Sequence, residues 1–328
     1  MPLFGTCERS RFWLCTDGCG LTCATVTWTL HIYAWAVVNK LLLRSWFGWS
    51  FWGMAHSCLY TCIVALALIS HGRAMLTDPG AVPSDAYPLP HHFSKLEAQG
   101  GWRKRRCCAK CGGMFKPPRA HHDSVTDRCI LKMDHFCPWV NNAVGLFNHK
   151  FFLLFVLYTM LSCGYTLALV VSRFVFCVRL KPYPMDEVAA AADEESCDEL
   201  GLLTILVVME GVLFGLFTMC MLCDQSPMLF SNLTKIDRLK GEKQGAHGKV
   251  NEIFGTRTSC GAWLSPFHDV YFPRDIFDDV VGFIQRSPES NVSAVLRMKD
   301  EEIDSLENGL IERDFGAGED CASSRLRI

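Results

Sequence analysis

Charge is scarce in this chain, and its two signs nearly cancel. Only 20% of the 328 residues are charged, and the formal net charge is −2. A chain without a basic excess gives no reason to expect a nucleic-acid partner. The sequence also contains no internal repeat, and its first apolar run has no clear cleavage site, so we expect that run to act as an uncleaved signal anchor.

Apolar residues are abundant instead, at 50% of the chain, and they are clustered. The long runs poor in charge lie roughly at 22–43, 51–71, 151–178 and 200–223. A helix needs about 20 apolar residues to cross the hydrocarbon core of a bilayer. The sequence therefore predicts a mainly α membrane protein with four transmembrane helices.

The loops between these runs differ in charge. Lys and Arg are frequent in 72–150, whereas Asp and Glu dominate 179–199. By the positive-inside rule, the first loop is expected in the cytosol and the second in the lumen or outside the cell. Both termini are then cytosolic.

This topology divides the chain into six predicted regions. They are a cytosolic N-terminal tail (1–21), a first transmembrane hairpin (22–71), a cytosolic cysteine-rich domain (72–150), a second hairpin with the acidic loop (151–223), a cytosolic C-terminal region (224–284) and a mobile charged tail (285–328). Residues 81–106, within the third region, are expected to form an irregular linker.

The chain has 18 cysteines, most of them in predicted spans or on the cytosolic side, where thiols stay reduced. Cys108 and Cys111 have the Cys-x2-Cys spacing of a zinc site, and His121, His122 and Cys129 follow at a distance suited to a second ligand pair. Incidental cysteines are the alternative. Spacing alone does not decide which of these residues bind metal.

The stretch Asp134-His135-Phe136-Cys137 places a carboxylate, an imidazole and a thiol within four residues. These groups can make an activated nucleophile, because an imidazole held by a carboxylate increases the reactive thiolate fraction. The same His135 and Cys137 could also be metal ligands. The function of the chain depends on which description holds for Cys137.

The run from Cys108 to Phe152, CAKCGGMFKPPRAHHDSVTDRCILKMDHFCPWVNNAVGLFNHKFF, resembles the cysteine-rich domain of the Asp-His-His-Cys (DHHC) protein S-acyltransferases. The resemblance includes Asp78-Pro79-Gly80 and, after the fourth span, a stretch with Thr234 and Asp237 at the ends of the family's Thr-Thr-x-Glu motif. It implies four spans with a small zinc-binding domain between the second and third. Phe136 replaces the second His of the name motif.

Carried over by position, the family's first zinc site falls on Cys108, Cys111, His122 and Cys129. Its second site would fall on Asp123, Thr126, Phe136 and Ala143, which are not a plausible zinc ligand set. We therefore expect one structural zinc, with the second site abandoned as a unit and filled by side-chain packing.

The resemblance also assigns the reaction. Cys137 is the expected nucleophile, His135 the base and Asp134 the orienting carboxylate, with Thr234 as a candidate partner of Asp134. The acyl group would come from acyl-CoA and pass to cysteines of substrate proteins. The family positions that contact the CoA phosphates are occupied by Lys116, Arg119 and His121, and Trp139 is expected beside the slot for the acyl chain.

The sequence thus predicts a protein-cysteine S-palmitoyltransferase whose partners are acyl-CoA, membrane lipids and proteins with membrane-proximal cysteines. The alternative is an inactive membrane scaffold with the same fold, which the loss of the second zinc site favours. Retention of Asp134, His135 and Cys137 favours the enzyme. Relatives suggest Golgi, endoplasmic reticulum or plasma membrane.

Overall fold

The computed structural model describes residues 13–98, 100–101, 106–180, 201–231, 234–239, 250–256 and 260–285. Most of the predicted N-terminal tail, nearly all of the acidic loop and nearly all of the predicted mobile tail lie outside the described residues.

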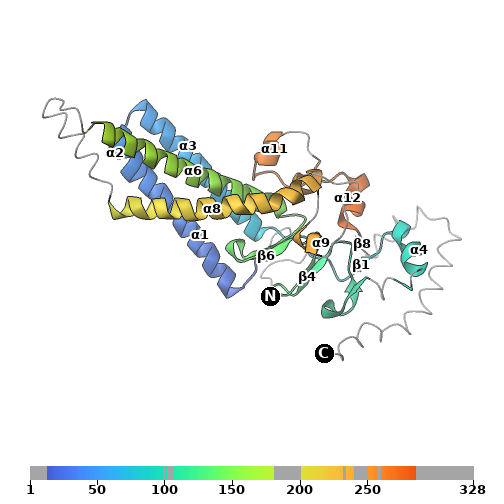
Figure 1. The fold of residues 1–328 in the computed structure, drawn as a ribbon. Coiled ribbons are helices and arrows are strands. Elements are labelled where there is room, and N and C mark those ends of the chain that lie inside the picture. The colour runs from blue at the N-terminus through green and yellow to red at the C-terminus, as the bar shows by residue number, and fades with distance from the viewer. Residues whose placement is uncertain are drawn as a thin grey trace.

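Four long helices lie side by side in a bundle, and the small strands gather at one end of it (Figure 1). Each is long and apolar enough to cross a membrane, which confirms the predicted fold class. The first span consists of α1 (Gly18–Val37), the π-helical η1 (Val38–Leu43) and α2 (Arg44–Phe47); the others are α3 (Phe51–Leu76), α6 (His149–Leu180) and α8 (Leu202–Ser231).

The helix ends follow from local chemistry. The Asp17 side chain caps α1 by accepting a hydrogen bond from the Gly20 N–H at 2.7 Å. Helix α3 ends just before Asp78-Pro79-Gly80. There Asp78 Oδ1 accepts hydrogen bonds from the N–H groups of Gly80 and Ala81, which closes a turn that directs the chain out of the bundle.

The outer face of the bundle is covered by large apolar side chains, such as the exposed Ile205, Leu213 and Leu216 of α8. Such a surface suits lipid rather than water. Inside the bundle, Arg173 donates hydrogen bonds to the carbonyl groups of Leu41 and Leu42 in η1. A π-helical segment rotates its carbonyls out of the regular ladder, and the buried guanidinium satisfies them.

Between α3 and α6 the chain forms three antiparallel two-stranded hairpins. They are β2 (Cys107–Cys108) with β3 (Met114–Phe115), β4 (His121–Asp123) with β5 (Arg128–Ile130), and β6 (His135–Cys137) with β7 (Asn142–Val144). Short η2 (Ala109–Cys111) and η3 (Pro138–Val140) turns follow β2 and β6. This domain carries the predicted site residues.

The expectation of an irregular linker over 81–106 is wrong. That segment contains β1 (Ala86–Tyr87) and α4 (Pro90–Ala98). Strand β1 pairs with β8 (Ile284–Gln285), close to the C-terminal end of the described chain. A strand of two residues has no periodicity to detect, and its partner is remote in sequence.

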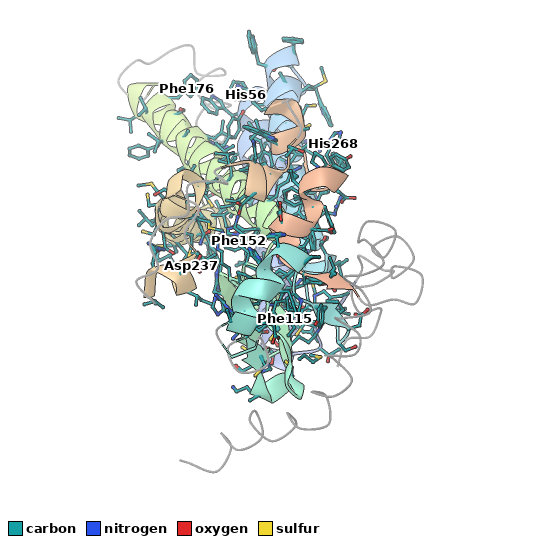
Figure 2. All side chains as sticks on the ribbon, turned by 90° about the vertical axis from the view of Figure 1, so that its right-hand side faces the viewer. His56, Phe115, Phe152, Phe176, Asp237 and His268 are labelled. Carbon is teal, nitrogen blue, oxygen red and sulfur yellow. The ribbon has the colours of Figure 1, made fainter. Side chains whose placement is uncertain are left out.

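The C-terminal region folds back onto the cysteine-rich domain and the bundle. Its helices are α9 (Lys235–Leu239), α10 (Asn251–Phe254), α11 (Cys260–Leu264) and α12 (Arg274–Val281). Phe272 and Phe283 share a buried core with Phe115 and Leu131. Figure 2 shows Phe115 at the end of the molecule opposite His56 and Phe176, with Phe152 and Asp237 between them.

Candidate active site and metal centre

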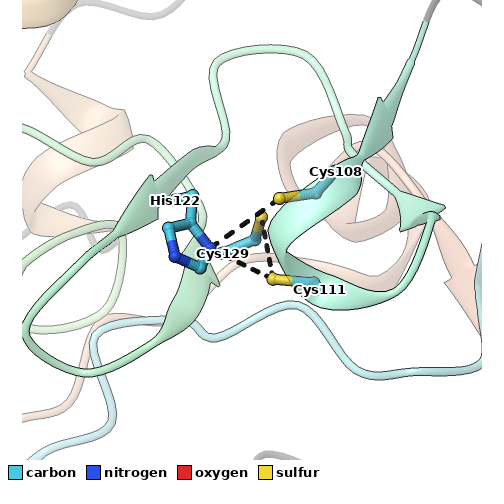
Figure 3. Close-up of side chains that lie close together, drawn as sticks. All are labelled: Cys108, Cys111, His122 and Cys129. Carbon is cyan, nitrogen blue, oxygen red and sulfur yellow. Dashed lines mark hydrogen bonds between the residues drawn. The ribbon is translucent and has the colours of Figure 1, made fainter. Parts of the chain in front are cut away.

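The predicted zinc ligands converge in space. Cys108 ends β2, Cys111 ends the η2 turn that follows it, and His122 lies directly opposite Cys129 in the β4–β5 hairpin (Figure 3). The ligand atoms of all four residues lie within 4.8 Å of one another. Gly112, with φ of 69°, provides the left-handed position that turns the Cys-x2-Cys loop back.

These distances fit a tetrahedral zinc ion. With Zn–S bonds of about 2.3 Å, two sulfur ligands of such an ion are roughly 3.8 Å apart. The Cys111 and Cys129 sulfurs are 3.8 Å apart, and His122 Nδ1 is 3.1 Å from the Cys111 sulfur and 3.7 Å from that of Cys108. Nε2 of His122 faces Asp127 Oδ1 at 3.3 Å, the carboxylate contact that commonly orients a ligating imidazole.

The residues at the second expected metal position make other contacts. Phe136 lies directly opposite Ala143 in the β6–β7 hairpin and packs against Ile130 and Met133. Apolar side chains thus occupy the space between the two strands.

In the neighbouring β4–β5 hairpin, Asp123 accepts hydrogen bonds from both the N–H and the hydroxyl of Thr126, at 3.0 and 2.6 Å. The carboxylate is used to close its own turn. Packing and hydrogen bonding of this kind match what the sequence suggested for the replaced ligands.

Asp134 is buried directly before the β6–β7 hairpin and accepts three hydrogen bonds. Its Oδ1 receives the Lys235 backbone N–H at 2.7 Å, and its Oδ2 receives His135 Nδ1 at 2.8 Å and Gln225 Nε2 at 2.9 Å. Burial alone would raise the pKa of this carboxyl, but the hydrogen bonds from His135 and Lys235 outweigh it and hold the pKa well below its usual range. Asp134 is therefore an ionised anchor.

His135 connects this anchor to the thiol. Its Nδ1 is bonded to Asp134, which leaves Nε2 as the ring atom available to Cys137, two residues along the same face of β6. Burial would lower the pKa of His135, but Asp134 and Cys137 raise it to about 9. The edge of the imidazole also packs on Phe152, with ring centroids 5.3 Å apart.

Two residues of this hydrogen-bond network, Gln225 and His149, were not predicted from the sequence. Gln225 bonds to Asp134 and, through Oε1, accepts a hydrogen bond from His149 Nε2 at 2.7 Å. The available signal was an uncharged amide at the end of an apolar run, which is weak by itself.

The expected partnership of Thr234 with Asp134 needs correction. The Thr234 hydroxyl instead accepts the Asp237 N–H, and Asp237 accepts the Thr234 N–H, so the two residues form a capping box at the start of α9. This box holds the Lys235 N–H toward Asp134, which makes the contribution of Thr234 indirect.

Asn142 joins the β6–β7 hairpin to the helix bundle. Asn142, directly opposite Cys137, donates to the carbonyl groups of Ala74 and Thr77 at the end of α3, both at 3.0 Å. Asn142 Oδ1 accepts the indole N–H of Trp13 at 2.7 Å. These buried bonds fix Cys137 relative to the helices.

Cys137 lines one end of a cavity that extends between α1, α6 and α8. The thiol side chain is buried among Phe152, Phe155 and Val156 of α6 and next to Met221 of α8. The cavity thus lies between the third and fourth spans, with α1 as an additional wall.

Trp139 is the predicted acyl-site residue that the structure brings to Cys137, since both line this cavity. Its indole contacts Phe214 and Phe217 of α8, and its carbonyl accepts the Nε2 N–H of His71 at 2.8 Å. His71 in turn accepts the indole N–H of Trp28, which fixes its tautomer.

The three residues predicted to bind the CoA phosphates lie between the end of β3 and the start of β4. Lys116 directly follows β3, and the buried His121 begins β4 opposite Ile130. Arg119 pairs with Asp237 at 3.0 Å and with Glu252 at 3.4 Å. Arg119 is therefore placed against α9, the helix that also contacts Asp134.

Lys132 joins the same charge network through a 2.8 Å contact with Glu252. Burial lowers the pKa of this ammonium to about 8, although Glu252 beside it favours the charged form. The C-terminal region is thus held to the cysteine-rich domain by partly buried ion pairs as well as by apolar packing.

The fold and these sites define an integral membrane protein with a buried cysteine–histidine–aspartate group beside a four-ligand metal centre. A model of the DHHC palmitoyltransferase family matches residues 103–242. Palmitoyltransferase ZDHHC7 of Rattus norvegicus is 36% identical over 278 residues, which cover 80% of this chain and 83% of the relative. Palmitoyltransferase ZDHHC3 of Homo sapiens is 37% identical over 260 residues, covering 78% and 83%.

A plant relative, probable protein S-acyltransferase 16 of Arabidopsis thaliana, is 40% identical over 125 residues, covering 36% of this chain and 42% of the relative. The chain belongs to the DHHC palmitoyltransferase family, a family of protein-cysteine S-acyltransferases. The resemblance stated from the sequence is confirmed.

Proposed function

We propose that this protein transfers a fatty acyl group, palmitoyl foremost, from acyl-CoA to cysteine thiols of substrate proteins through a thioester on Cys137. The observation that carries the proposal is the position of Cys137. It stands at the end of an apolar cavity, next to an imidazole that Asp134 orients. Thiol, base and acyl slot are brought together in one place.

The residues have distinct roles in the two stages. In the first, His135 Nε2 takes the proton of Cys137, the sulfur attacks the acyl carbonyl, and the thiol of CoA leaves with that proton. In the second, His135 accepts the proton of a substrate cysteine, whose sulfur attacks the Cys137 thioester and returns Cys137 as a thiol. Asp134 stabilises the imidazolium in both stages. Exchange of one thioester for another is nearly balanced in energy.

The acyl chain would lie in the cavity and the CoA outside it. Each buried CH2 contributes about 0.8 kcal/mol, so a long chain binds strongly in an apolar slot. Trp139 would contact the chain near the thioester. Lys116 and His121 are the better candidates for the CoA phosphates, because Arg119 already has two carboxylate partners.

One structural zinc would be held by Cys108, Cys111, His122 and Cys129, whose atoms are spaced for it. Zinc there supplies folding free energy to a domain built from three short hairpins. The second family site would hold no metal, since Phe136 and Ala143 fill it.

The charge of the loops favours an orientation with the cysteine-rich domain and both termini in the cytosol. Acyl-CoA and membrane-proximal cysteines of substrate proteins would then reach Cys137 from the same side. Golgi, endoplasmic reticulum or plasma membrane are suitable compartments.

The test uses purified protein in detergent or vesicles with a labelled palmitoyl-CoA. Wild type should form an adduct that hydroxylamine removes, and Cys137→Ala should lose both the adduct and transfer to a protein thiol. Cys220→Ala, at an exposed thiol on α8, is the matched control and should label normally. Equal labelling of wild type and Cys137→Ala would favour the inactive scaffold.

A further inference from the structure

The cavity that begins at Cys137 is mostly apolar, but its wall carries a carboxyl group far from the thiol. Near the thiol its walls are Phe152 and Phe155. Farther from the thiol it is lined by Ser162, Cys163, Thr166 and Glu210, together with the apolar Ala34 and Val207. The distal methyl end of an ordinary fatty acyl chain would offer no hydrogen bond to that carboxyl.

The direction of depth follows from the two helices. Helix α6 starts beside the β6–β7 hairpin at His149, so Thr166 lies farther from Cys137 than Phe152 does. Helix α8 runs the opposite way, since Gln225 near its end contacts Asp134. Lower residue numbers on α8 are therefore deeper. Figure 2 shows Phe152 close to the cysteine-rich domain and Phe176 at the remote end of α6.

The depth of Glu210 matches the length of a long acyl chain. Met221 packs against the apolar cluster that contains Cys137, and Glu210 is about three helical turns, or roughly 17 Å, deeper on the same helix. A saturated chain with carbon–carbon bonds of about 1.5 Å advances roughly 1.3 Å per carbon, so extended palmitoyl spans roughly 19 Å. Its last carbons would reach the Glu210 carboxyl.

Most polar groups at this depth are already hydrogen-bonded. The Thr166 hydroxyl pairs with Ser162 O and the Tyr60 hydroxyl, both at 3.0 Å, and His31 Nε2 contacts the Thr159 hydroxyl at 3.1 Å. By contrast, Oε2 of Glu210 is buried and has no hydrogen-bond partner among the residues that the structure describes. A buried carboxyl oxygen without a partner is costly, so this atom is suited to a hydrogen-bonding ligand.

We propose that Glu210 makes the acyl slot selective for fatty acyl chains that carry a hydroxyl group at or near the terminal carbon. The hydroxyl would bond with Glu210 Oε2 at the end of the slot, while the preceding methylenes contact the aromatic walls. A saturated chain of the same length would leave the carboxyl facing a methyl group. This inference rests on the proposed acyl transfer through Cys137 and names the class of acyl donor.

The experiment is a competition between palmitoyl-CoA and 16-hydroxypalmitoyl-CoA for formation of the Cys137 thioester. Wild type should favour the hydroxylated donor roughly tenfold, the factor that one net hydrogen bond of about 1.4 kcal/mol corresponds to. Glu210→Gln keeps a hydrogen-bonding group and should retain the preference, whereas Glu210→Leu should reverse it. Met209→Leu, at an exposed neighbouring position, is the control and should behave as wild type.

A wild type that labels equally with both donors, or prefers palmitoyl, overturns the inference while leaving acyl transfer intact. A ratio that is unchanged in Glu210→Leu overturns it too. Should Glu210→Leu fail to fold, the ratios of wild type and Glu210→Gln still decide the matter. Absence of a thioester from either donor would overturn the proposed function itself, and with it this inference.

Discussion

Two neighbouring hairpins of the cysteine-rich domain carry the same three chemical groups, although their order along the chain differs. In β4–β5, Asp127 contacts His122 Nε2, and Nδ1 of that ring faces the sulfur atoms of Cys108 and Cys111. In β6–β7, Asp134 bonds to His135 Nδ1, and the other ring nitrogen is available to Cys137. In each hairpin a carboxylate thus contacts one ring nitrogen of an imidazole, and the other ring nitrogen faces sulfur.

The two hairpins differ in the number of additional thiols that lie near the imidazole. The β4–β5 hairpin receives Cys108 and Cys111 from the preceding turn, so its imidazole becomes one of four converging ligands. In β6–β7 the thiol faces Asn142, and its neighbour Phe136 faces Ala143. Among the described residues, no metal-binding group includes that thiol. If Cys137 is the nucleophile that we propose, the cross-strand neighbours rather than the residue type distinguish it from a metal ligand.

The largest expected difference between the two hairpins is their response to loss of the metal. A structural zinc contributes on the order of 10–16 kcal/mol in zinc-finger peptides, so Cys129→Ser should cost several kcal/mol and unfold the cysteine-rich domain. Cys137→Ser should keep both the zinc content and the thermal stability of wild type. Elemental analysis and thermal unfolding of the two variants measure this. Similar zinc loss in both would mean that Cys137 is a ligand, and the comparison would fail.

The next largest effect is expected at His135, the imidazole of the β6–β7 hairpin. His135→Gln keeps a donor for Asp134 but removes the base, so the rate of thioester formation should fall by about 10²–10⁴-fold. Zinc content should stay unchanged. His122→Gln should instead lose metal and stability, because it removes one of the four expected zinc ligands. A His135→Gln variant with near-normal acylation would remove His135 from the mechanism.

A smaller effect is expected at Gln225, which ties Asp134 to His149. Gln225→Leu deprives two buried polar groups of a partner, a loss of about 1–3 kcal/mol that should slow thioester formation roughly tenfold. Ser226→Ala, at the adjacent residue, is the matched control. The rates are followed with labelled acyl-CoA. Equal rates in the two variants would show that Asp134 is held without Gln225.

The pH dependence of stability distinguishes the hairpins in another way. The folded pKa of His135 is raised to about 9 from 6.5, so its contribution to stability is complete below about pH 6.5 and is lost as the pH rises through 9. The gap in melting temperature between wild type and His135→Gln should therefore narrow from pH 6.5 to 9.5. A gap that stays constant or widens would contradict the charged state assigned to His135.

The features that could be predicted from the sequence are local patterns, and those that could not be predicted are contacts between residues far apart in the chain. The four spans were predictable because long apolar runs are local patterns, and the four residues that could hold a metal were predictable from the Cys-x2-Cys spacing together with the family resemblance. The contacts around Asp134 were not, since Gln225 and the Lys235 N–H come from elements about 90 residues or more away. The pairing of β1 with β8 was missed for the same reason. Non-local polar contacts leave no periodic signal.

The smallest effect tests whether the second metal site can be restored by one residue. Phe136→His recreates the name motif of the family, but Ala143 directly opposite and Thr126 offer no sulfur or imidazole. Zinc content should therefore stay at that of wild type. Stability should fall by about 1–3 kcal/mol, because the ring that packs on Ile130 and Met133 is replaced by a polar one. If the variant instead gains a second zinc with unchanged stability, the packing of Phe136 is not what keeps metal out of the family's second zinc site.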